Sequence, residues 1–158
     1  MDKGLFIITG ANGGMGKAIT RAIAGTGVPV IMACRNVERA AEVRDEIVRE
    51  TGNGRVELHR LDLASVASIR SFVDGLNGRE VRVLVNNAGI MCRDFSTTED
   101  GVETTVGVNY MGTWLLTNWL LPNMGRSGRS RIINTSSVTC KMGKVGDHFF
   151  ALDPEHYR

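Results

Sequence analysis

The sequence predicts an α/β protein with a doubly wound parallel sheet, and two observations lead to this class. Short apolar runs alternate with longer amphipathic stretches, which is typical of parallel strand–helix–strand units with right-handed crossovers. The first apolar run, residues 5–9, leads directly into a glycine-rich turn at residues 10–16. At 158 residues the chain is long enough for one domain, residues 1–158.

The apolar runs predict strands at residues 5–9, 28–33, 56–61, 81–85 and 131–135. The amphipathic stretches predict helices at residues 14–26, 36–50, 65–76 and 101–123. Asn36 and Ser65 are the expected N-caps of two of these helices, because their side-chain oxygens can accept a hydrogen bond from the first turn. We expect a three-layer sandwich of the Rossmann type with strand order 3-2-1-4-5. After Ser137 the pattern dissolves, so the sheet is expected to lack its C-terminal strands.

The glycine-rich turn is the most specific local signal in the chain. Gly10 permits the tight turn, Gly14 lets the backbone approach a pyrophosphate, and Gly16 lets the helix pack closely on the strand. The N-terminus of that helix presents N–H groups and the positive end of its dipole to the phosphates. A bland tight turn is the alternative, but the flanking strand and helix favour a dinucleotide. The expected contact residues of the turn are Gly10, Asn12, Gly13, Gly14, Met15 and Gly16.

The end of the second strand predicts which dinucleotide is bound. NAD-binding domains usually carry an acidic residue there, which accepts a hydrogen bond from the ribose 2′-hydroxyl. This chain has Arg35 instead, whose guanidinium can pair with a 2′-phosphate. Asn36 can add a hydrogen bond, and Lys17 lies nearby in the first helical turn. A surface arginine before an N-cap is the alternative interpretation. NADP(H) is therefore the favoured cofactor, with NAD(H) less favoured.

Asp62 and Leu63 follow the third strand, at the edge of the sheet where an adenine would lie. The Asp62 carboxylate can accept a hydrogen bond from the adenine amino group. Asp62 can equally be a loop residue before Ser65, and its position alone does not decide between the two.

The composition argues against several other classes of protein. A net charge of +2 is too small to indicate nucleic-acid binding, and the loop that contains Arg126, Arg129 and Arg131 is expected to be a solvated connector. The three cysteines are scattered and have no C-x-x-C spacing, which argues against a disulfide framework or a zinc site and is typical of a reducing cytoplasm. The apolar stretches are too short for a signal peptide or a membrane span. We therefore expect no metal, no membrane span and a cytoplasmic location.

Taken together, the motifs of the chain resemble those of the short-chain dehydrogenase/reductase family. In order they are Thr9-Gly10-x-x-x-Gly14-x-Gly16, Asp62-Leu63, Asn86-Asn87-Ala88-Gly89, Val108-Asn109-Tyr110-x-Gly112 and Arg131-Ile132-Ile133-Asn134-Thr135-Ser136-Ser137. The resemblance covers essentially the whole chain. Segments 33–36, 61–65 and 98–101 are similar in particular to the branch of NADP-dependent retinol dehydrogenases and protochlorophyllide reductases.

The resemblance implies a hydride transfer between a nicotinamide and an alcohol or carbonyl carbon. Ser137 would donate the hydrogen bond that polarises the substrate oxygen, with Ser136 as the alternative and a plain turn serine as the bland interpretation. Asn109 lies mid-helix, where asparagine is a poor helix former. In the family the matching asparagine distorts the helix and holds a water in a proton relay.

The resemblance also implies roles for the segment after the fourth strand. Asn87, Ala88 and Gly89 would contact the ribose and nicotinamide side of the cofactor, and Asn86 would tie the sheet together. The helix at 101–123 is apolar on several faces, and in the family it packs on the next helix and on a second subunit. A homodimer or homotetramer is therefore expected.

The chain departs from the family pattern at the proton donor, a tyrosine in Tyr-x-x-x-Lys. Tyr110 has Trp114 at the lysine position, and for Tyr157 that position lies past the last residue, Arg158. Tyr157 is also farther from Ser137 than is usual. We therefore expect the catalytic pair beyond residue 158, Tyr157 to be a loop residue, and the 158-residue chain alone to be inactive.

Three functional hypotheses follow from these observations. The first is an NADP(H)-dependent oxidoreductase of a carbonyl or alcohol substrate, seen without its Tyr-x-x-x-Lys segment. The second is a truncated, non-catalytic module that senses or sequesters NADP(H). A regulator of related fold fits the glycine-rich turn equally well, but it does not account for Ser137 and Asn109. The third is a methyltransferase with the same strand–glycine–helix start, but Arg35 does not suit its adenosine ribose.

Overall fold

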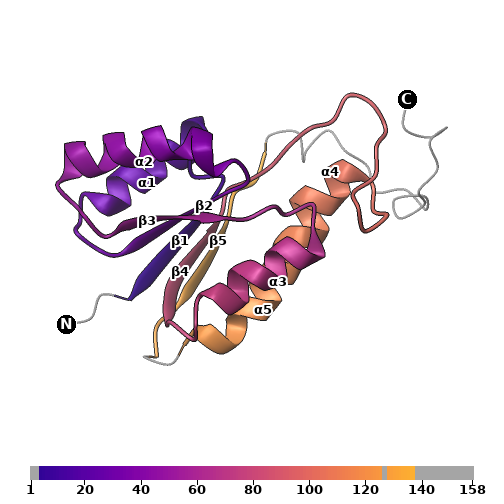
Figure 1. Cartoon of the computed structure of the whole chain (residues 1–158). Helices are drawn as coiled ribbons and strands as arrows, with labels where there is room; N and C mark the ends of the chain where they lie inside the picture. Colours follow the sequence, from indigo (N-terminus) through magenta and orange to yellow (C-terminus); the bar gives the residue numbers. More distant parts are fainter. Residues whose placement is uncertain (1–3, 126–127, 138–158) are drawn as a thin grey trace.

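Five parallel strands form a sheet in the order β3-β2-β1-β4-β5 in the computed structural model (Figure 1). The structure describes residues 4–125 and 128–137. The strands are β1 (Leu5–Thr9), β2 (Val30–Cys34), β3 (Val56–Arg60), β4 (Val81–Asn86) and β5 (Arg131–Asn134). All of these pairings are parallel, so the predicted strand order is confirmed.

Helices cover both faces of the sheet. They are α1 (Gly14–Ala24), α2 (Val37–Thr51), α3 (Val66–Gly75), α4 (Thr104–Val106), the π-helix η1 (Gly107–Gly112), α5 (Thr113–Leu120) and the 3₁₀-helix η2 (Leu121–Asn123). Figure 1 shows α1 and α2 on one face of the sheet, and α3 and α5 on the other. The predicted three-layer, doubly wound architecture is therefore confirmed.

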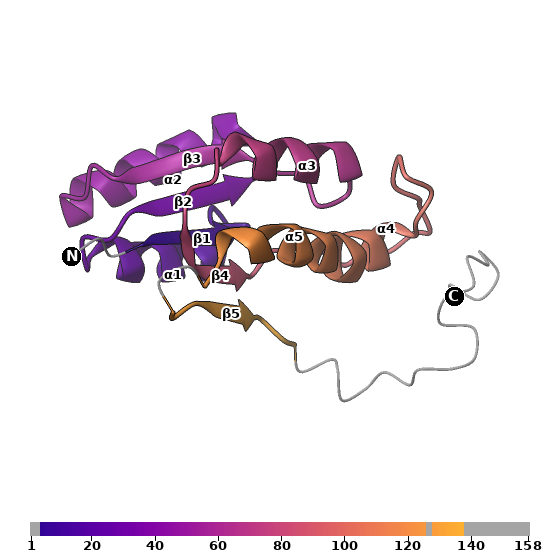
Figure 2. The ribbon, with the colours of Figure 1, turned by 90° about the horizontal axis from the view of Figure 1, so that it is seen from below.

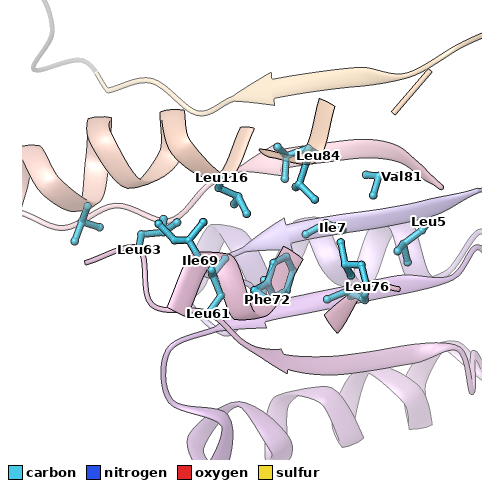
Figure 3. Packing of buried hydrophobic residues seen from close by; sticks show 14 residues of the cluster. Leu5, Ile7, Leu61, Leu63, Ile69, Phe72, Leu76, Val81, Leu84 and Leu116 are labelled. Carbon is cyan, nitrogen blue, oxygen red and sulfur yellow. The ribbon is translucent and has the colours of Figure 1, made fainter. Parts of the chain in front are cut away.

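Two apolar clusters hold the three layers together. One cluster lies between the sheet and the pair α3 and α5, and it contains Ile7, Phe72 and Leu116 (Figure 3). The other lies against α1 and α2 and contains Ile8 and Ile47. Ile7 and Ile8 are neighbours in β1 yet belong to opposite clusters, because successive side chains of a strand point to opposite faces. The continuous apolar runs of the sequence are thus explained by burial on both faces.

Most predicted boundaries lie within two residues of the observed ones, and both predicted N-caps are confirmed. The Asn36 side chain accepts a hydrogen bond from the backbone N–H of Arg39 at 2.7 Å, at the start of α2. The Ser65 hydroxyl accepts one from the N–H of Ser68 at 3.1 Å, at the start of α3.

The helix expected at residues 101–123 is wrong at its beginning. Gly101 has a φ of +79°, which a right-handed helix cannot contain, and helical structure begins only after it. The Glu103 carboxylate caps this start, since it accepts hydrogen bonds from the N–H groups of Thr105 (2.8 Å) and Val106 (2.7 Å). The helix is also not uniform, because it passes through the π-turn of η1 before α5.

Strand β5 lies at the edge of the sheet, beside β4 (Figure 2). Its neighbouring residues Ile132 and Ile133 point to opposite faces and are 39% and 48% exposed. Within the described part of the chain, β5 is therefore covered on neither face. Its carboxyl end leads to Ser137.

Candidate functional site

A cleft of about 570 Å³ opens at the carboxyl ends of β1, β2, β3 and β4. All of the residues predicted to contact a cofactor lie along it. They are Gly10, Asn12, Gly13, Gly14, Met15, Gly16, Arg35, Asn36, Asp62, Leu63, Asn87, Ala88 and Gly89. Ligands of open α/β sheets bind at this edge, so one site collects segments that are far apart in the sequence.

The glycine-rich turn has the geometry that its predicted role requires. Gly10 has a φ of +62°, in the left-handed region that favours glycine. A Cβ on Gly16 would collide with the Gly10 carbonyl oxygen and lie 2.7 Å from Asn87 Nδ2. A Cβ on Gly14 would meet no atom within 4 Å, so the backbone there is open. The turn fits a pyrophosphate, with close packing behind it and an accessible backbone in front.

Thr9 and Asn87 brace the glycine-rich turn against the end of β4. The Thr9 hydroxyl oxygen accepts hydrogen bonds from the N–H groups of Asn87 and Ala88, both at 3.0 Å. The Asn87 side-chain amide donates to the carbonyl oxygens of Thr9 (3.0 Å) and Gly10 (3.3 Å). Thr9 belongs to the motif of the turn but was not among the predicted site residues; its hydroxyl directly before Gly10 was the available signal. Asn87, predicted as a cofactor contact, uses its side-chain nitrogen to hold the turn.

A positively charged pair of side chains, called the pole below, lies where β2 passes into α2. Arg35 and Arg39 line the cleft there, and both are exposed. Arg39 was missed from the sequence; its signal is its place one helical turn after the N-cap Asn36. Lys17 does not belong to this pole, because its Nζ pairs with Glu46 Oε2 of α2 at 2.7 Å. Lys17 does not line the cleft, so a contribution of Lys17 beside Arg35 stays a prediction.

Asp62 follows β3, the strand next to β2, and has a structural role in its loop. Its Oδ1 accepts a hydrogen bond from the N–H of Ala64 at 2.9 Å, and its own N–H donates to Ser68 Oγ at 2.9 Å. The loop interpretation of Asp62 is thus observed. The carboxylate also lines the cleft, so an adenine contact stays a prediction.

A second cavity, of about 940 Å³, adjoins the cleft and contains the predicted catalytic residues. Asn109, Ser136 and Ser137 all line it. The segment 87–90 lines both the cleft and this cavity and forms their shared wall. Tyr157 lies outside the described residues.

Asn109 lies in η1, so the helix is distorted at this residue as expected. Its side chain makes two hydrogen bonds to one backbone unit. Oδ1 accepts from the N–H of Ile90 at 2.8 Å, and Nδ2 donates to the Ile90 carbonyl at 2.7 Å. Asn109 therefore fixes the shared wall between the two cavities.

Cys34 lies beneath the glycine-rich turn and is buried. Burial raises the pKa of its thiol, while hydrogen bonds from the backbone of Asn12 and Ala11 act in the opposite direction. The thiol is neutral at pH 7 and serves as a small packing residue. Within residues 4–125 and 128–137, no cluster of His, Cys, Asp or Glu side chains is arranged to hold a metal ion. In the same part of the chain, no helix combines the length and apolar character that crossing a membrane needs.

The strand order places the cleft at a topological switch point. The chain runs outward from β1 through β2 to β3 and then returns to β4 on the other side of β1. Dinucleotides bind at this point in doubly wound sheets. The fold and the glycine-rich turn therefore define a nucleotide-binding protein of the Rossmann class.

The particular family follows from comparison with known sequences. Residues 5–150 match the family described as short chain dehydrogenase. This match covers most of the sequence, and the chain belongs to the short-chain dehydrogenase family. The predicted resemblance is confirmed.

Two relatives belong to the predicted branch of the family. Retinol dehydrogenase 11 of Homo sapiens is 42% identical over 153 residues, which cover 96% of this chain and 48% of the relative. Retinol dehydrogenase 13 of Mus musculus is 48% identical over 141 residues, which cover 88% of this chain and 42% of the relative. The chain spans about half the length of the relatives it matches.

A solved structure supports the same family. A metagenomic short-chain oxidoreductase in complex with NADP matches with a TM-score of 0.77 and 31% identity. The match covers 96% of this chain and 68% of the metagenomic protein.

Proposed function

We propose that the protein is an NADP(H)-dependent oxidoreductase that transfers a hydride between the nicotinamide and a carbonyl or alcohol carbon. The observation that carries this proposal is the shared wall at residues 87–90, which lines both the cofactor cleft and the cavity with Asn109 and Ser137. A cofactor bound in the cleft would lie next to a substrate bound in the cavity, and residues 87–90 would contact both.

The charges of the cleft support NADP(H) over NAD(H). The charged residues that line it are Arg35, Arg39 and Asp62. Arg35 directly follows β2, where the ribose is expected, and Arg39 lies in the first turn of α2. Arginine pairs well with a phosphate dianion through its planar guanidinium. The metagenomic relative with NADP bound agrees with this assignment.

The bound cofactor would supply or accept the hydride. Ser137 would donate a hydrogen bond to the substrate oxygen and stabilise the negative charge that develops there. Asn109 would hold the shared wall in place through Ile90, while its Oδ1 keeps a second lone pair that can accept a hydrogen bond from a water. This chemistry and the retinol dehydrogenase relatives support a small-molecule aldehyde, ketone or alcohol as the substrate.

A non-catalytic NADP(H)-binding module is the second candidate. Within residues 4–125 and 128–137, Tyr110 has Trp114 at the lysine position of Tyr-x-x-x-Lys, so a catalytic pair would have to come from elsewhere in the protein. Without a tyrosine and lysine, general acid–base catalysis worth about 10²–10⁴ in rate would be lost.

Titration and turnover separate these candidates. The intact gene product would be titrated with NADPH and NADH by calorimetry, then assayed for NADPH oxidation with a panel of aldehydes and ketones. Tighter NADPH binding with turnover that Ser137→Ala abolishes is the expected result. Binding without turnover supports the module, and an absence of binding to either nucleotide would falsify both candidates.

We also propose that the chain assembles through the outer face of η1 and α5. Met111 and Trp114 are 42% and 54% exposed, and both line an apolar cavity of about 100 Å³ together with Val66 of α3. Contiguous exposed apolar surface of this kind is typical of protein interfaces.

A further inference from the structure

Asn86, the last residue of β4, joins three elements at the wall of the second cavity. It is 6% exposed. Its side-chain amide donates hydrogen bonds to Thr117 Oγ1 of α5 (3.1 Å) and to Asn134 Oδ1 of β5 (2.8 Å). Its backbone carbonyl accepts a hydrogen bond from the N–H of Thr135 at 2.9 Å. One residue of β4 therefore holds the carboxyl end of β5, which leads to Ser137.

Thr117 extends these contacts to the π-helix. Its hydroxyl donates to the carbonyl oxygen of Thr113 at 2.8 Å, and the Thr113 hydroxyl donates to the carbonyl oxygen of Val108 at 3.2 Å. Val108 directly precedes Asn109 in η1. A chain of hydrogen bonds thus runs from the π-helix through α5 and Asn86 to β5. We call residues 108, 113, 117, 86 and 134 the polar chain.

The side chain of Asn86 is not fully satisfied by this arrangement. Both of its amide hydrogens are engaged, yet Oδ1 is buried and has no hydrogen-bond partner among the described residues. A buried acceptor without a partner lowers stability, and an apolar side chain would avoid this penalty. The Asn86 amide therefore serves to position α5 and β5, because its two N–H groups hold these elements in one relative geometry.

We infer that Thr117 and Asn134 are positioning residues for the reaction. Acting through Asn86, they fix the strand that carries Ser137 relative to the π-helix that carries Asn109. The inference rests on the proposed function, because it concerns the geometry of that reaction site. A displacement of about 1 Å in a catalytic group can lower a rate about a hundredfold, so small movements of β5 matter.

The test compares Thr117→Val, which removes the hydroxyl, with Thr117→Ser, which keeps it. Asn118→Ala is the matched control, because the Asn118 side chain also bonds to a carbonyl one turn earlier in α5, at 2.8 Å, but lies outside the polar chain. Two readouts are taken on the intact gene product: amide hydrogen exchange at Thr135 and Ile90, which needs no turnover, and NADPH-dependent reduction.

Thr117→Val is expected to speed exchange at both Thr135 and Ile90. It is also expected to lower kcat about tenfold to a hundredfold with the KM for NADPH unchanged. Thr117→Ser is expected to keep both the exchange rates and kcat near the wild-type values, and Asn118→Ala is expected to change neither. Faster exchange confined to α5, or a Thr117→Val enzyme with normal kcat, would overturn the inference.

Failure of the proposed function remains distinguishable from failure of this inference. If the wild-type protein shows no turnover, the proposed function fails, while exchange at Thr135 and Ile90 still decides the inference. If Thr117→Val does not fold, Asn134→Ala replaces it, because Asn134 is exposed and its loss leaves the core intact. Where both variants fold, the double variant is expected to be no more impaired than the worse single variant, because both break one chain. A double variant whose loss of kcat equals the product of the two single losses would overturn the inference.

Discussion

Reversing the charge of Arg35 is expected to shift cofactor preference from NADPH toward NADH. Arg35 directly follows β2, lines the cleft beside Arg39, and is exposed, so its replacement should not disturb the core. Arg35→Asp would place a carboxylate where it can accept a hydrogen bond from a ribose 2′-hydroxyl. The same carboxylate would repel a 2′-phosphate.

The size of the effect follows from the contacts that are lost and gained. A hydrogen bond to a charged group contributes about 1.5–3 kcal/mol, and the exposure of Arg35 favours the lower end of this range. Removing the guanidinium is therefore expected to weaken NADPH binding about tenfold, since Arg39 retains part of the positive charge. The added carboxylate contributes a repulsion of about 1 kcal/mol in a solvated site, or a further fivefold. We expect Arg35→Asp to weaken NADPH binding about fiftyfold and to leave NADH binding equal or stronger.

Calorimetric titration with both nucleotides at low and high salt measures this effect. Arg49→Asp is the matched control, because it makes the same change in net charge on the last turn of α2, and Arg49 is exposed and outside the cleft. The loss caused by Arg35→Asp should shrink at high salt, where surface charges are screened.

Two results would refute the assignment of Arg35 to the 2′-phosphate. If Arg35→Asp weakens NADPH and NADH binding equally, the arginine supports the loop and does not select the cofactor. If Arg49→Asp causes the same loss, only the overall charge of the protein matters.

Three further predictions test the turn, an ion pair and the assembly. Gly16→Ala is expected to lower stability by about 1–3 kcal/mol through overpacking and to abolish NADPH binding. Gly14→Ala has open space at its Cβ, so it should keep the wild-type Tm and lose only affinity for NADPH. Calorimetry measures the Tm and titration the affinity, and an unaffected Tm for Gly16→Ala would contradict the predicted collision. A hydrogen bond from Arg79 holds the pKa of the Glu57 carboxyl below its usual range, so its contribution is present above the unfolded-state pKa of about 4.3 and is lost as the pH falls through the lowered folded-state pKa. Glu57→Gln should therefore destabilise the protein at pH 7, by less than about 1 kcal/mol because the pair is partly exposed. In strong acid the wild type and the variant should be equally stable. Urea unfolding at pH 7 and in strong acid checks this, and an equal loss of stability under both conditions would contradict it. Trp114→Glu is expected to reduce the assembly state seen by light scattering, and a wild-type monomer would remove the basis for the proposed interface.

The sheet and its layers could be predicted because local patterns determine them. Runs of residues buried on both faces, such as Ile7 and Ile8, identify a central parallel strand without knowledge of its partners. The beginning of the helix after Gly101 could not be predicted in this way. It depends on the Glu103 carboxylate, which folds back onto the first turn, and on a bridge between Glu103 and Thr97.

The cofactor cleft could be predicted for a topological reason. The carboxyl ends of parallel strands meet at one edge of the sheet, so each strand-end motif contributed residues to the same site. The positions of charged side chains near the cleft were less predictable. Lys17 pairs with Glu46 because α1 packs on α2, and Arg39 reaches the cleft because Asn36 sets where α2 begins.

Two asparagines at this site act mainly through backbone groups. Asn87 donates to the carbonyl oxygens of Thr9 and Gly10, and Asn109 closes a pair of hydrogen bonds with Ile90. An amide suits these places because it offers a donor and an acceptor without charge. An aspartate of the same shape would place a carboxylate against two carbonyl oxygens at position 87. The residue type is thus selected for holding the cofactor turn and the shared wall at fixed positions, and a direct contact to the cofactor is not needed to explain it.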